Sequence, residues 1–152
     1  MPKEAFERAV GALGQHERTT AELESWLGER GYPATEVADA VERLIAIGEL
    51  DDERFARRYA EDKRELRGWG ADRIREALAA KGLDRATIEA AVAGGSADEE
   101  LERALALLER RAEAAIDEAS RARALAYLAR RGYGSEVAYE AVRAFERGAT
   151  RA

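Results

Sequence analysis

The chain has 152 residues and no cysteine, which excludes disulfide bridges, thiolate metal sites and thiol nucleophiles. It is 46% hydrophobic and 37% charged with only two prolines, and without long runs of alternating β-branched residues this composition indicates an all-α fold. The net charge of −6 disfavours non-specific binding to nucleic acid, but residues 51–81 carry nine basic and eight acidic side chains. Any such contact would therefore come from a local face, and this middle segment is the best candidate.

The first fifty residues predict three helices. Within residues 23–41, apolar residues four apart precede Gly31 and others four apart follow it, as in two helices joined by a tight turn. Glycine can adopt the left-handed conformation that ends a helix, and Tyr32 can then fold back on the last turn, as in a Schellman cap. The apolar face of the preceding helix contains Phe6, Val10 and Leu13.

The next segment, residues 50–94, repeats this pattern around Gly82. Its first helix is predicted to begin at Asp51 or Asp52, because an aspartate there can accept hydrogen bonds from the free amides of the first turn. The alternative is that this aspartate pair contacts a partner. A helical wheel places three residues on the inward face: Phe55, Tyr59 and Leu66.

Residues 95–152 form a third copy, which follows the linker 94–96 and turns at Gly132. The three turn glycines lie 51 and 50 positions apart, so the chain contains an internal repeat of about fifty residues. The sequence therefore predicts three tandem three-helix repeats, at residues 1–49, 50–94 and 95–152. Such small units are stabilised by packing on their neighbours, and we expect an elongated, curved array.

The middle repeat carries the candidate partner-binding side chains. The wheel places Arg57 and Arg64 opposite the packed face, where arginines can bind phosphate or carboxylate groups with two parallel hydrogen bonds. The competing interpretation is a solvated face with ordinary acid–base pairs. The other basic candidates flank this stripe or follow on the next helix: Arg54, Arg58, Arg67, Arg73, Arg75 and Lys81.

Trp69 stands between Gly68 and Gly70, and two interpretations remain open. The glycines can end one helix and open the next, with the indole ring folded over the turn. Alternatively, the ring is an anchor in a partner's pocket, a role in which tryptophan is enriched.

No enzymatic motif is present. The single histidine, His16, has no catalytic partner nearby in the sequence, and no nucleophile elbow, phosphate-binding loop or metal-ligand spacing occurs. We therefore expect no enzyme, no metal and no cofactor. The N-terminus lacks an apolar signal core and no stretch is long enough to cross a membrane, so a cytoplasmic protein is expected.

The segment from Leu50 to Leu83 resembles the signature of the RecX regulatory proteins. The matching residues are Leu50, Asp51, Asp52, Arg54, Phe55, Ala56, Tyr59, Gly68, Gly70, Ile74, Leu78, Lys81, Gly82 and Leu83. The resemblance extends over nearly the whole chain: residues 17–33 look like the family's first repeat, and residues 102–111 and 128–142 look like its third. One departure is Ala71, where the family tends to have proline.

The resemblance implies a negative regulator of the RecA recombinase that acts in DNA repair, homologous recombination and the SOS response. Such a protein lies in the groove of the RecA–DNA filament and suppresses ATP hydrolysis, strand exchange and co-protease activity, without a cofactor. DNA inside the filament is a further candidate contact, and we expect a monomer. The rival hypothesis is a stand-alone helical nucleic-acid-binding module that uses the basic face of the middle repeat.

Overall fold

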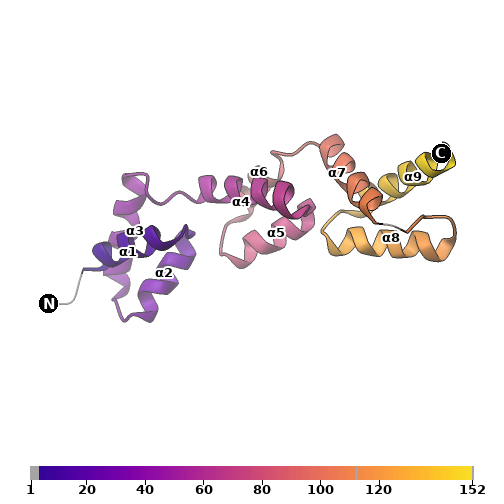
Figure 1. The fold of residues 1–152 in the computed structure, drawn as a ribbon. Coiled ribbons are helices and arrows are strands. Elements are labelled where there is room, and N and C mark those ends of the chain that lie inside the picture. Colours follow the sequence, from indigo (N-terminus) through magenta and orange to yellow (C-terminus); the bar gives the residue numbers. More distant parts are fainter. Residues whose placement is uncertain (1–3, 112, 152) are drawn as a thin grey trace. The chain divides into compact units, whose positions relative to one another are not determined.

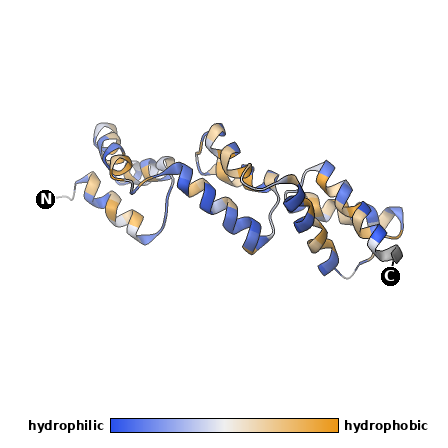
Figure 2. Ribbon diagram, turned by 90° about the horizontal axis from the view of Figure 1, so that it is seen from above, coloured by the Kyte–Doolittle hydropathy of each residue, from blue (hydrophilic) through white to orange (hydrophobic). Residues whose placement is uncertain are grey.

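The computed structural model describes residues 4–111 and 113–151, with side chains described up to residue 148. This part of the chain is all-α and contains three tandem three-helix repeats (Figure 1). The first repeat comprises α1 (Ala5–Gln15), α2 (Thr20–Glu29) and α3 (Ala34–Ala46); the second α4 (Asp52–Arg67), α5 (Ala71–Ala80) and α6 (Arg85–Val92); the third α7 (Ala97–Arg110), α8 (Glu118–Arg130) and α9 (Ser135–Arg151). The helices show the amphipathic colouring expected when each buries one face, with hydrophobic and hydrophilic residues alternating along the ribbon (Figure 2).

The chain divides into two compact units. One contains Met1–Arg58 and Leu78–Ala91, and the other contains Tyr59–Ala77 and Val92–Ala152. The second repeat therefore contributes to both units: α4 and α5 each have one part in either unit. The repeat borders at 49/50 and 94/95 stay a prediction.

The core of the first unit is aliphatic and joins all three helices of the first repeat. Leu23, Leu27 and Leu44 are fully buried, and Leu50 is 2% exposed. Alanines fill the positions where α1 approaches its neighbours, which allows the helices to pack closely. Burying these leucines stabilises the unit by about 1.5–3 kcal/mol for each side chain.

The core of the second unit is built in the same manner around α7, α8 and α9. Leu108 and Leu128 are at most 1% exposed, and Tyr133 is 3% exposed. The Tyr133 hydroxyl donates a hydrogen bond to the carbonyl of Gly68 at 2.9 Å, so its polar end is satisfied inside the unit.

The three turn glycines end their helices with the same cap, as predicted. Gly31, Gly82 and Gly132 have φ angles of 86°, 81° and 96°. The amide of the residue after each glycine donates to a leucine carbonyl five positions back: Tyr32 to Leu27 at 3.4 Å, Leu83 to Leu78 at 3.4 Å and Tyr133 to Leu128 at 3.0 Å. This is the longer of the two Schellman bonds, and it satisfies carbonyls that the helix end leaves free.

The turn of the second repeat packs on the start of α2, and we call this contact the first joint. The Thr19 hydroxyl donates to the carbonyl of Lys81 at 2.7 Å, and the Lys81 ammonium lies 3.5 Å from Glu22. A Cβ atom added at Gly82 would lie 2.4 Å from the Cβ of Ala21. Only glycine fits this approach.

The turn of the third repeat packs on the start of α5 in the same way, which we call the second joint. The Gly70 amide donates to the Arg131 carbonyl at 2.7 Å, and the Asp72 amide donates to the Gly132 carbonyl at 2.9 Å. A Cβ atom added at Gly132 would lie 2.5 Å from the backbone nitrogen of Arg73. Here the two backbones themselves are in contact.

Helix α4 buries a different face from the predicted one. Ala56 and Ala60 are fully buried and Phe55 and Tyr59 are half-buried, whereas Leu66 is 77% exposed. The prediction that Leu66 points inward is wrong. The wheel identifies an apolar stripe, but the small alanines beside it allow the closer packing and therefore face the core.

The two aspartates before α4 have separate structural roles. Asp51 accepts a hydrogen bond from the Arg54 amide at 3.0 Å, which caps the helix that begins at Asp52. Asp52 accepts instead from the Thr20 amide at 2.8 Å, at the start of α2. The predicted capping role is confirmed for Asp51, while Asp52 caps a helix of the preceding repeat.

Candidate interaction surface

Four of the candidate cations lie in the first unit, and three of them are held by the fold. Arg54 donates to the Gly48 carbonyl at 3.0 Å, and Arg58 lies 2.7 Å from the Glu17 carboxylate. Lys81 belongs to the first joint, and its ammonium also lies 5.8 Å from the Phe55 ring centroid. The side chain of the fourth, Arg57, is exposed and makes no hydrogen bond, ion pair or ring contact with the described residues.

Arg64 in the second unit occupies a structural position, contrary to the prediction that it faces away from the packed side. It is half-buried, and its Nη2 donates to the Val92 carbonyl at 2.8 Å, at the end of α6. Burial lowers the pKa of its guanidinium, and the neighbouring Arg103 lowers this pKa further. The reason is the same shift of the α4 face, because Arg64 stands four residues after the buried Ala60 and therefore lies on the packed side.

The other cations of the second unit differ in their engagement. Arg75 lies 2.8 Å from Asp72, a surface pair of ordinary strength. Arg73 places its guanidinium carbon 4.2 Å from the centroid of the Trp69 ring. The side chain of Arg67 is exposed and contacts no described partner, although its backbone carbonyl accepts a hydrogen bond from Arg131 at 2.9 Å.

Trp69 is half-buried in a cluster of aromatic and basic side chains, which we call the Trp69 cluster. Its ring meets that of Tyr59 edge to face, with centroids 6.4 Å apart and planes at 68°. The Lys63 ammonium lies 4.9 Å from the indole centroid, and Arg73 lies near the same ring. The indole therefore covers the turn between α4 and α5, with cation–π contacts to the two basic residues. Gly68, with a φ angle of 66°, ends α4 in front of it.

Lys63 is the member of this cluster that the sequence reasoning missed. It stands four residues after Tyr59, the spacing that brings two side chains together on a helix, and its ammonium is 5.2 Å from the Tyr59 centroid. That spacing is visible in the sequence, but nothing in the sequence shows that Trp69 folds back over it.

The remaining signature residues hold the middle repeat in place. Leu50, Ile74 and Leu78 are buried at 2% exposure or less. Gly70 and Gly82 make the close backbone approaches of the second and first joints. The signature therefore records mainly the architecture of the repeat.

No group of three or more histidine, cysteine or acidic side chains with metal-ligand geometry occurs among the described residues. His16 is exposed, with Nδ1 2.9 Å from the Glu17 carbonyl. None of the described helices combines the length and apolar character that crossing a membrane requires.

These observations define a class: an all-α protein of tandem three-helix repeats joined through glycine turns, with an aromatic and basic cluster in its middle repeat. Three family models match the chain in order: the first three-helix domain of RecX at residues 5–44, the second at 51–92 and the third at 98–142. The chain belongs to the RecX family.

Relatives with the name "Regulatory protein RecX" match most of the chain. The relative from Mycobacterium ulcerans is 41% identical over 135 residues, which cover 86% of this chain and 78% of the relative. The one from Trichlorobacter lovleyi is 33% identical over 141 residues, covering 90% and 92%. The crystal structure of RecX from Lactobacillus salivarius has the same fold, with a TM-score of 0.87 at 18% identity over 93% of this chain and 94% of that one. The family supports a regulatory role.

Proposed function

We propose that this chain is a negative regulator of the RecA recombinase that acts by binding in the groove of the RecA–DNA filament. The observation that carries the proposal is the ordered match of all three RecX domains, together with relatives named as regulatory proteins. Bound there as a monomer in the cytoplasm, the protein suppresses ATP hydrolysis, strand exchange and co-protease activity. It thereby regulates homologous recombination, DNA repair and the SOS response.

The contacts in the middle repeat suit a protein partner. Tryptophan, tyrosine and arginine are the side chains most enriched among residues that dominate binding energy at protein interfaces. The Trp69 cluster offers all three in a half-buried arrangement, and the fold already holds the ring in place. Binding therefore costs little side-chain entropy at this position.

Arg57 and Arg67 complete the proposal because their side chains have no partner among the described residues. The cations that the fold uses for pairs, caps and joints are less available to another molecule. The net charge of −6 makes the protein repel polyanions in general. Exposed cations on such a protein therefore favour one partner whose acidic groups match their positions.

The alternative is direct binding of nucleic acid through the Trp69 cluster. An aromatic ring beside basic side chains is an arrangement on which nucleobases stack. This hypothesis predicts affinity for bare single-stranded DNA that falls steeply with salt, because each neutralised phosphate releases counterions.

The two hypotheses separate in one pair of measurements. RecA ATPase activity on single-stranded DNA is titrated with the chain at substoichiometric ratios, and binding to the same DNA without RecA is followed over a salt series. We expect inhibition of the ATPase and weak binding to bare DNA. Absence of both inhibition and filament binding would refute the proposal, and tight, salt-sensitive binding to bare DNA would favour the alternative.

A further inference from the structure

The two joints follow one plan. In the first joint the Thr19 hydroxyl donates a hydrogen bond to the Lys81 carbonyl, and in the second the Gly70 amide donates one to the Arg131 carbonyl. Thr19 and Gly70 are equivalent, because each stands four positions before the first buried apolar residue of its hairpin. In each case this carbonyl immediately precedes the turn glycine of the next repeat. One half of a joint is thus a helix start, and the other half is a glycine turn.

Each repeat has one such helix start, at its second helix, and one glycine turn. The two joints use two of the three starts and two of the three turns. The turn left over is that of the first repeat. Gly31 has a similar left-handed φ angle of 86°, but no described residue other than its chain neighbours lies within 4 Å of a Cβ atom added there. Arg30 folds back from this turn, with its guanidinium carbon 3.5 Å from the Trp26 ring centroid. The turn is formed like the other two but stays open.

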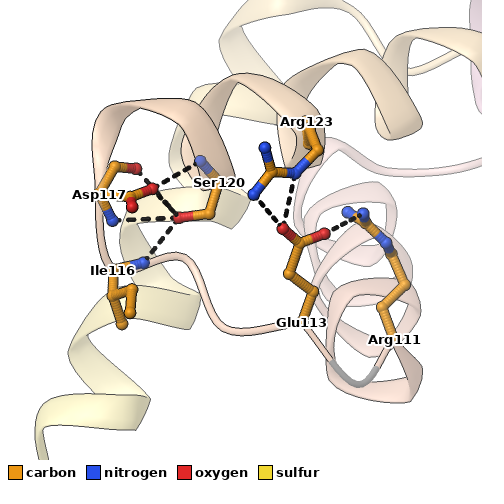
Figure 3. A network of polar contacts seen from close by, with 6 residues as sticks. All are labelled: Arg111, Glu113, Ile116, Asp117, Ser120 and Arg123. Atoms are coloured by element: carbon orange, nitrogen blue, oxygen red, sulfur yellow. Dashed lines mark hydrogen bonds and ion pairs between the residues drawn. The ribbon is translucent and has the colours of Figure 1, made fainter.

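The helix start left over is that of α8, and a short segment of the chain closes it. Ser120 stands at the position of Thr19 and Gly70 in the repeat. Its hydroxyl accepts from the amides of Ile116 and Asp117, both at 3.0 Å, and its own amide donates to the Asp117 carboxylate at 2.8 Å (Figure 3). Ser120 is consequently 4% exposed, although no glycine turn of the described residues packs on it.

An ion-pair network holds this closing segment. The Glu113 carboxylate accepts from Nε of Arg123 at 2.6 Å and from Arg111 at 3.1 Å (Figure 3). The hydrogen bond from Arg123 holds the pKa of Glu113 below its usual range. Arg123 stands at the repeat position of Arg73, which packs against Gly132 in the second joint.

We propose that the Gly31 turn and the start of α8 are the two free halves of a third joint, that a second copy of this chain is the partner they fit, and that residues 113–120 keep the α8 half closed. The segment thus prevents head-to-tail association of copies. Terminal repeats of solenoid proteins need a polar cap for the same reason.

A second copy of this chain is the fitting partner because the two free halves resemble the two halves of the second joint. Arg131 in that joint lies beside the Tyr127 ring at 5.3 Å, and Arg30 lies beside Trp26 at the equivalent positions. The opposing helix start carries arginine in both cases, Arg73 or Arg123. Ser120 also has a hydroxyl, which can donate to a carbonyl as Thr19 does in the first joint. The contact is small, so the association belongs to the weak, transient class.

The proposal is tested in the full chain by removing the contacts that close the start of α8. The double variant Glu113→Ala/Asp117→Ala removes the ion pairs and the cap but keeps Ser120. We expect its sedimentation coefficient to rise with concentration, while the wild type stays monomeric. Gly31→Asn in the same chain abolishes the rise, because asparagine tolerates the left-handed conformation but adds a side chain to the turn.

Mixing gives the sharper form of this experiment. A chain with the triple change Glu113→Ala/Asp117→Ala/Gly31→Asn can offer only its α8 half, and the wild type can offer only its turn. We expect each to be monomeric alone and the mixture to form one-to-one dimers. Far-UV circular dichroism verifies folding, and Glu113→Ala alone, which leaves the Ser120 cap intact, is the milder variant that shifts in the same direction. Folded variants that stay monomeric at every concentration, or association indifferent to Gly31→Asn, would overturn the proposal.

Discussion

The two joints solve one packing problem with different chemistry. In the first, a side chain provides the hydrogen bond and a methyl group meets the glycine: the Thr19 hydroxyl bonds the Lys81 carbonyl, and Ala21 lies over Gly82. In the second, backbone meets backbone, with Gly70 and Gly132 in direct contact and two main-chain hydrogen bonds. A side-chain contact can adjust to a substitution, but a backbone contact cannot. The second joint therefore tolerates substitution of its glycine less well than the first joint does.

The largest expected effect is that of Gly132→Ala. The added Cβ lies 2.3 Å from the Cβ of Arg73 and 2.5 Å from its backbone nitrogen, and it also strains the left-handed backbone. We expect a loss of about 3–5 kcal/mol in the free energy of unfolding, because overpacking and backbone strain add. Urea denaturation measures this loss. A loss below that of Gly82→Ala would reverse the ranking of the joints.

Gly82→Ala is expected to cost less, about 2–4 kcal/mol. Among the described residues its Cβ meets Ala21 alone, with the Cβ of Ala21 at 2.4 Å. Ala21→Gly in the same chain therefore restores part of the lost stability, and a double-mutant cycle measures this coupling. The matched pair Gly132→Ala/Arg73→Gly is not rescued, because the backbone nitrogen of residue 73 remains. Equal rescue in both cycles would show that the two joints do not differ in kind.

Tyr133, which lies next to the second joint, makes the free energy of unfolding depend on pH in the alkaline range. Burial raises the pKa of Tyr133 from the ordinary value of 10.0 to about 12. The neutral form is thus favoured in the folded state, so its contribution to stability is complete below pH 10 and is lost as the pH rises through about 12. We expect Tyr133→Phe to lower stability by about 1 kcal/mol at neutral pH, where the bond to Gly68 is lost.

Denaturation midpoints of wild type and Tyr133→Phe between pH 8 and pH 12 test this sign. The difference between the two proteins shrinks with rising pH if Tyr133 is the group that titrates. A constant difference over the whole range would show that groups other than Tyr133 cause the loss of stability at alkaline pH.

Among the three turn glycines the smallest expected effect is that of Gly31→Ala, which serves as the control for the other two. The φ angle is also left-handed, but in the part of the chain that the structure describes no atom beyond the chain neighbours lies within 4 Å of the added Cβ. The cost reduces to backbone strain, about 1–2 kcal/mol. Measured beside Gly82→Ala and Gly132→Ala, it separates strain from contact, and a loss equal to theirs would show that strain alone explains all three.

Much of the fold could be predicted from the sequence because its signals are local. Apolar residues four apart on either side of Gly31, Gly82 and Gly132 predict the hairpins, and the Schellman caps confirm the role of these glycines. The joints could not be predicted, because they connect residues about sixty positions apart and depend on backbone approach. Gly70 reads as a helix opener in the sequence, whereas in the structure it is the contact point of the second joint.

The candidate site was predictable only in part. A helical wheel weighs Leu66 above Ala60 as a core residue, yet the smaller side chain is buried and the larger is exposed. This rotation of the packed face also makes Arg64 structural, while Arg57 and Arg67 remain without described partners. Trp69 covers its own turn, and whether it also anchors a partner stays a prediction.

Regulation of RecA through the middle repeat is tested most directly by Arg57 and Arg67, the two candidate cations whose side chains have no partner among the described residues. RecA ATPase activity on single-stranded DNA is titrated with wild type, with Arg57→Glu/Arg67→Glu, and with Arg130→Glu as an exposed control in α8. We predict that the double variant, with unchanged helicity, needs an about tenfold higher concentration for half inhibition, because like charges then face an acidic partner. The control inhibits like wild type. Equal inhibition by all three proteins would contradict the account.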